Sequence, residues 1–124
     1  MTLKQRQICA VFLLIAAAAV SVLPKPLAVQ ERNLTQVIYD YAVTSYCGTL
    51  DGEVERGFRR ELAEQTLRSG LNEAAARKQR IKGWVMADDE WRNRGLGGHK
   101  AWCREEGMAA SHHFRAIARG DKEP

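Results

Sequence analysis

Apolar residues recur at intervals of three and four from about residue 33 to residue 119, interrupted by glycines and by polar residues that suit helix caps. This spacing places side chains on one face of an α-helix, whereas a half-buried strand needs strict alternation, which no stretch of the chain sustains. We therefore predict an all-α fold, a small domain of four helices.

The first two predicted helices are bounded by capping and stop residues. Asn33 can cap the first, with Gln36 completing a capping-box pattern, and Gly48 can end it. Asp51 can cap the second helix, which Gly70 ends. The side chains predicted to face inward are Leu34, Val37, Ile38, Tyr41, Ala42 and Ser45 in the first helix and Val54, Phe58 and Leu62 in the second.

The third predicted helix is the longest and runs from a cap at Asn72 to a glycine cluster at residues 95–98. Asp88 lies on its apolar stripe, where a carboxylate requires a partner. Arg92, four residues further on, is the predicted ion-pair partner. The stripe itself consists of Ile81, Trp84, Val85 and either Trp91 or Arg92.

The fourth predicted helix spans about Lys100 to Arg119, and its inward seam contains Cys103. Cys47 lies at the end of the first helix, while Cys9 belongs to the N-terminal segment. Since disulfides persist in exported proteins, we predict one intramolecular disulfide, Cys47 to Cys103. Two reduced thiols or a bridge between chains is the alternative. The seam consists of Cys103, Gly107, Ala110, Phe114 and Ile117.

The N-terminal segment has the layout of a secretory signal. Lys4 and Arg6 precede an apolar run from Ile8 to Leu23, which spans about 24 Å as a helix. That length is short of the roughly 30 Å hydrocarbon core of a membrane. We predict a signal peptide over residues 1–28 and a helical domain over residues 29–124. Cleavage after Ala28 would put Pro26 at a position that prefers a small residue, so retention as a membrane anchor is the alternative.

Removal of the signal changes the charge of the protein. Residues 1–28 carry three of the 19 basic residues and none of the 15 acidic ones, so the net charge falls from +4 to +1. A domain with so little net charge lacks the basic field that nucleic-acid binding uses. We therefore predict no nucleic-acid partner, and a membrane contact only if the signal is retained.

The segment from Asp88 to Cys103 concentrates aromatic, charged and glycine residues. Exposed Trp and Arg side chains are common anchors at protein interfaces, and glycine turns bring backbone amides close to a partner. Packing of both tryptophans in the core is the alternative. The candidate partner-binding residues are Trp91, Arg92, Arg94, His99, Lys100 and Trp102.

Catalytic and metal-binding patterns are weak. His112 and His113 are adjacent, about 100° apart around a helix, and so do not suit one metal ion. The chain has no GxSxG, CxxC or complete phosphate-binding loop motif. We assign no catalytic residue, no metal ligand and no cofactor, and we predict that the protein is not an enzyme.

We therefore predict a periplasmic or secreted bacterial protein that acts by binding a protein partner of unknown identity, as a monomer or weak oligomer. Three alternatives remain. The protein is a periplasmic acid-stress chaperone, a small metal-binding protein or enzyme that uses His99 with the acids at 88–90, or an anchored accessory subunit of an inner-membrane complex.

Overall fold

The computed structural model describes residues 32–124, so the predicted signal peptide, residues 1–28, lies outside the described part of the chain. The elements are α1 (Leu34–Tyr46), α2 (Gly52–Ser69), α3 (Glu73–Asn93), α4 (Gly98–Trp102), η1 (Cys103–Gly107) and α5 (Met108–Arg119). Because α4, η1 and α5 follow one another without a break, the described residues form four helical rods and no strand, which confirms the predicted fold class. None of these helices is long and apolar enough to cross a membrane.

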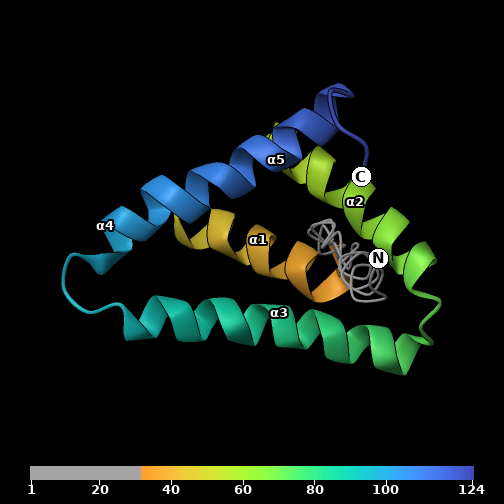
Figure 1. The fold of residues 1–124 in the computed structure, drawn as a ribbon, viewed down its shortest axis with the longest axis horizontal. Coiled ribbons are helices and arrows are strands. Elements are labelled where there is room, and N and C mark those ends of the chain that lie inside the picture. The colour runs from red at the N-terminus through yellow and green to blue at the C-terminus, as the bar shows by residue number, and fades with distance from the viewer. Residues whose placement is uncertain (1–31) are drawn as a thin grey trace, which may run out of the picture.

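Helix α1 is the central element. In the view of Figure 1, α3, α2 and the rod that runs from α4 to α5 form three sides of a triangle, and α1 lies inside it. The closest pairings are α1 with α3 and α2 with α5, and α1 also contacts α2, η1 and α5. The core therefore surrounds α1, and the other rods contribute one side each.

The predicted caps are confirmed. The side-chain oxygens of Asn33, Asp51 and Asn72 accept hydrogen bonds from backbone amides in the first turns of α1, α2 and α3. The capping box at the first helix is only half formed, because the backbone amide of Gln36 donates to Asn33 but its side-chain amide donates to Asp40 instead of reaching back to the cap. Local sequence therefore locates the helix starts correctly.

The central position of α1 explains one error in its predicted inward face. Val43 and Thr44 are buried although they lie off the predicted face, because the helix has neighbours on several sides. Ser45, predicted to face inward, is exposed. A helix buried nearly all round does not show a single apolar stripe.

Helix α2 buries Val54 as predicted, but the rest of its inward line differs from the predicted one. Gly57, Glu61 and Gln65 are buried, whereas Phe58 and Leu62 are only partly buried. A Cβ atom on Gly57 would lie 1.8 Å from the backbone oxygen of Phe114. The missing side chain therefore lets the backbones of α2 and α5 touch.

Helix α3 corrects the sequence analysis most clearly. The residues that it buries are small, Ala76, Gly83 and Ala87, while Ile81 and Val85 are 52% and 51% exposed. A Cβ atom on Gly83 would lie 2.6 Å from the backbone oxygen of Thr35 in α1. The predicted inward stripe of large residues was therefore wrong, because α3 rotates its small residues toward α1 and its large ones outward.

The last rod carries the disulfide. Cys47 and Cys103 are bonded, with their Cα atoms 5.3 Å apart, which confirms the predicted pairing. The π-helical turn η1 begins at Cys103, and a Cβ atom on Gly107 would lie 2.8 Å from the sulfur of Cys47. The predicted seam is confirmed as well, since Ala110 and Phe114 are buried.

Gly57→Ala tests the backbone contact between α2 and α5. The added methyl group has no room beside Phe114, so we expect a loss of about 2 kcal/mol in unfolding free energy despite the better helix propensity of alanine. Urea unfolding followed by circular dichroism, with the disulfide intact, measures it.

Gly52→Ala is the matched control on the same helix. A Cβ atom there meets nothing closer than the end of the Arg56 side chain at 3.7 Å, so stability should stay the same or rise slightly. Equal stability of the two variants would contradict the close approach of the helices.

Candidate functional site

Trp91, one of the predicted partner-binding residues, is held between two rings. It stacks on Tyr46 with ring centroids 5.2 Å apart and on His99 with centroids 3.8 Å apart. The Nε2 atom of His99 also lies 2.6 Å from the carbonyl oxygen of Trp91, to which it donates. Trp91 and His99 therefore close the turn between α3 and α4.

Trp102 is a core residue with an exposed fraction of 2%. The Arg94 guanidinium covers its ring, 4.7 Å from the centroid, and is itself paired with Glu90. Trp102 therefore supports the fold, and its indole offers no surface to a partner.

The other members of this set lie at the surface. Arg92 is exposed and forms an ion pair with Asp88 at 2.9 Å, as predicted, and Tyr46 donates a hydrogen bond to Asp88. Lys100 is exposed and lines a shallow hollow of about 360 Å³ next to the disulfide. At the tip of the turn, Leu96 is fully exposed. Partner binding by these residues stays a prediction.

Two of the three acids at 88–90 have partners other than His99. Asp88 is bound to Arg92 and Tyr46, and Glu90 to Arg94, while His99 faces a backbone carbonyl. No three His, Cys, Asp or Glu side chains within residues 32–124 lie close enough together to hold a metal ion.

The structure reveals a further candidate binding surface, which consists of exposed apolar residues on the outward side of α3. Ile81 and Val85 lie one turn apart on the side away from α1, and Trp84, 41% exposed, lies at their edge. Lys78 extends this surface toward the start of α3 and Asp88 toward its end. We refer to these five residues as the outward α3 face.

An aromatic chain joins the outward α3 face to the core. The ring of Trp84 meets Tyr41 edge-on at 6.2 Å, and Tyr41 stacks on Phe58 at 3.7 Å. Phe58 in turn meets the buried ring of Phe114 at 5.8 Å. The tryptophan is therefore fixed at its inner edge while much of its surface stays in solvent.

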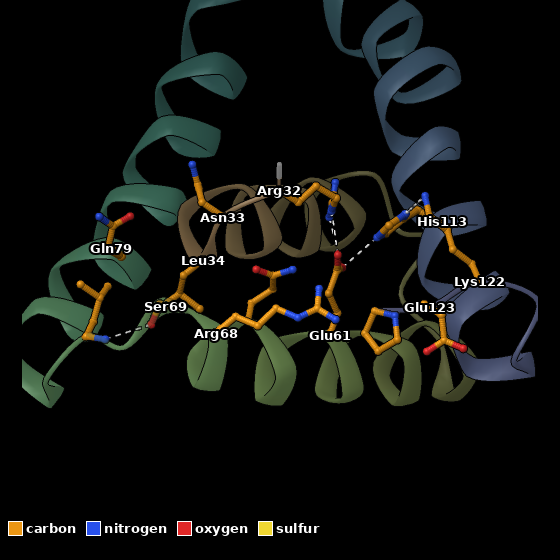
Figure 2. Close-up of a pocket in the computed structure, with 13 residues that line it drawn as sticks. Arg32, Asn33, Leu34, Glu61, Arg68, Ser69, Gln79, His113, Lys122 and Glu123 are labelled. Carbon is orange, nitrogen blue, oxygen red and sulfur yellow. Dashed lines mark hydrogen bonds and ion pairs between the residues drawn. The ribbon is translucent and has the colours of Figure 1, made fainter. Parts of the chain in front are cut away.

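A second candidate is a charged cluster at the other end of α1. Figure 2 shows the Glu61 carboxylate between Arg32 and His113, which come from the start of the described chain and from α5. Glu61 is 1% exposed. Its two oxygens accept hydrogen bonds of 2.7 and 3.2 Å from Arg32, and one of them accepts a bond of 2.8 Å from His113.

Outer partners complete the cluster. Asp40 accepts a hydrogen bond of 2.6 Å from Arg32, and the Lys122 ammonium lies 3.0 Å from the other ring nitrogen of His113. The Lys122 ammonium has only hydrogens to donate, so that nitrogen is placed to accept, while Nε2 of His113 donates to Glu61.

The surroundings of Glu61 set its ionisation. Burial by itself would raise the pKa of this carboxyl, but the hydrogen bonds from His113 and Arg32 outweigh burial and hold the pKa below its usual value of 4.5. The carboxylate is therefore ionised at neutral pH, and its paired charge joins α2 to α5 and to the start of α1.

The cluster lines a cavity of about 810 Å³ between α1, α2, α3 and the C-terminus. Gln65 and Arg68 of α2 face it as well, but Arg68 is paired with Glu64. Because both oxygens of Glu61 are engaged by Arg32 and His113, the carboxylate acts as a structural tie and not as a free base.

Sequence analysis missed Glu61 and the outward α3 face. Glu61 follows Val54 and Gly57 at spacings of three and four, which marks the buried line of α2, but a charged residue in such a line reads as a surface position.

The comparisons with known proteins add no family. No protein-family model matches the chain, and no match was found among curated proteins or solved structures.

Glu61→Gln tests the charged cluster. The variant leaves the Arg32 guanidinium without its buried counter-charge and weakens the hydrogen bond from His113, so we expect a loss of about 3 kcal/mol in unfolding free energy at pH 7. Because the folded pKa of Glu61 lies below the unfolded one, this contribution is present above about pH 4.5 and is lost as the pH falls through the folded pKa. The gap between wild type and variant should therefore narrow on acidification, as urea unfolding from pH 7 to pH 3 would measure.

Glu64→Gln is the control. It removes a carboxylate from a more exposed ion pair with Arg68 on the same helix, so stability should change by less than about 1 kcal/mol. A constant gap between wild type and Glu61→Gln across this pH range would contradict the role given to the ionised carboxylate.

Proposed function

We propose that the protein is exported to the bacterial periplasm and acts there by binding a protein chain through the outward α3 face. The observation that carries this proposal is the exposure of Ile81 and Val85 in the middle of a regular helix, beside a half-exposed tryptophan. Export rests on the N-terminal pattern, and the Cys47–Cys103 disulfide is compatible with it.

The exposed surface results from the rotation of α3 about its own axis. Its small residues meet α1 at backbone distance, so its large apolar residues have no place in the core of the described domain. Exposed apolar patches rimmed by charge are typical of protein interaction surfaces. Lys78 and Asp88 supply such a rim, while aromatic residues such as Trp84 are enriched at interfaces.

The tip of the turn between α3 and α4 is a second surface for the same function. Leu96 is fully exposed there, with Arg92 and Lys100 nearby along the chain. Of the predicted partner-binding residues, we therefore keep the exposed ones and exclude Trp102, whose side chain is buried.

Site-specific photocrosslinking in the exporting cell tests the proposal. A photoreactive phenylalanine analogue at Trp84 is expected to give discrete covalent adducts with another protein chain, and the same analogue at Leu96 tests the tip. Arg56, an exposed residue of α2, is the control position and should give none. No discrete adduct from either test position would contradict the proposed function.

A second candidate function, acid-stress chaperone, is favoured by Glu61. Protonation of this buried carboxyl removes a negative charge that faces Arg32 and His113, with Asp40 and Lys122 beyond them. Loosening of the contacts between α2, α5 and the start of α1 would then expose apolar surface at low pH.

Client aggregation measured at about pH 2 to 3, below the ordinary carboxyl pKa values, tests the chaperone. Wild type should suppress aggregation there and not at pH 7. Glu61→Gln should extend the suppression toward neutral pH, because it lacks at every pH the charge that acid removes from wild type, while Glu64→Gln should behave as wild type. Aggregation that wild type leaves unchanged at pH 2 to 3 would contradict this function.

A further inference from the structure

The outward side of α3 carries a seam with a regular spacing. Its positions alternate at intervals of four and three residues, as the apolar positions of coiled coils do. The seam lies on the opposite side of the helix from Gly83, which meets α1. The six positions are Ala74, Lys78, Ile81, Val85, Asp88 and Arg92.

The seam is apolar at its centre and oppositely charged on either side. Ile81 and Val85 occupy the two central positions, Lys78 precedes them and Asp88 follows them. The helix shows the same asymmetry in its net charge, since residues 73–82 carry four basic side chains and one acidic one, whereas residues 88–94 carry three acidic side chains and two basic ones. A surface with this pattern is complementary to its own copy when the copy runs in the opposite direction.

We propose that a second copy of this chain binds to the outward α3 face. Its α3 runs antiparallel to the first, and the two-fold axis crosses the outward side of the helix at the level of Gly83. This inference rests on the proposed function. In this arrangement Ile81 packs on the partner's Val85, and Lys78 faces the partner's Asp88. The symmetry repeats both contacts. Two apolar layers then lie between two charged layers, and each charged layer pairs Lys78 of one copy with Asp88 of the other.

Other arrangements of the same two helices are less favourable. A parallel pair in register sets Lys78 against its own copy and Asp88 against its own copy, so like charges meet. In an antiparallel pair displaced by one heptad, Ile81 faces a charged side chain of the other copy. Val85 then faces either an alanine or an aspartate, so the apolar side chains no longer contact each other. The register centred on Gly83 is the one that matches apolar with apolar and base with acid.

Access and size agree with a reversible dimer. Figure 1 shows α3 as one side of the fold, with α1 on its inner side. The helix has 21 residues and is about 31 Å long. Two apolar layers make a small interface, so we expect a dissociation constant on the order of micromolar or weaker. Its charged layers should make the dimer stronger at low ionic strength.

Charge reversal at the seam tests the dimer. Sedimentation equilibrium of the exported, disulfide-bonded protein at about 10 mM salt, where the Debye length is about 30 Å, should show a monomer–dimer equilibrium. Lys78→Glu should weaken it by about tenfold or more, because two carboxylates then face each other in each charged layer. Combining Lys78→Glu with Asp88→Lys should restore wild-type dimerisation. Arg56→Glu, the same charge change on α2, should leave the equilibrium unchanged.

The outcomes separate this inference from the proposed function. Lys78→Glu carries the test even if Asp88→Lys, which loses the hydrogen bond from Tyr46, proves unstable by circular dichroism. A wild type that stays monomeric at all concentrations, or a Lys78→Glu variant that dimerises as wild type, overturns the second copy as occupant. Crosslinks from position 84 to a chain of another mass would then leave the proposed function standing, whereas adducts of twice the chain mass support the dimer.

Discussion

The close approach of α3 to α1 at Gly83 is the constraint on which the rest of the structure depends. With the space for a Cβ atom taken by the backbone of Thr35 and the side chain of Ile38, α3 can meet α1 only with its small residues. That contact fixes the rotation of α3 about its own axis. The exposure of Ile81 and Val85 is therefore a direct consequence of how the core is packed.

The same principle operates between α2 and α5, where Gly57 lies against the backbone of Phe114. Both close pairings leave little room for large side chains between the helices, so the aromatic residues fill the space around α1. Phe114, Phe58 and Tyr41 form a connected chain there, and Trp84 continues it to the surface. The exposed Trp84 is thus connected to the core by a continuous series of ring contacts.

Features with a local cause could be predicted from the sequence. Helix starts at Asn33, Asp51 and Asn72 depend on neighbouring residues alone, and the disulfide follows from two cysteines in one compartment. The rotation of α3 and the burial of Glu61 depend on distant partners. Arg32 is 29 residues from Glu61 and His113 is 52 residues from it, so no window of sequence shows why a carboxylate occupies the core. Hydrophobicity alone also favours a large apolar residue at a buried helix position, whereas close contact between two helices requires a glycine there.

The two ends of α1 are held by different chemistry. At its C-terminal end the Cys47–Cys103 disulfide joins it to η1, while at its start Arg32, Asp40 and Glu61 connect it to α2 and α5. The first tie depends on an oxidising compartment and the second on an ionised carboxylate. Because the outward α3 face owes its exposure to α1, loosening either end changes the support beneath that face. We therefore expect acid and reducing conditions to act on the same surface from opposite ends of one helix.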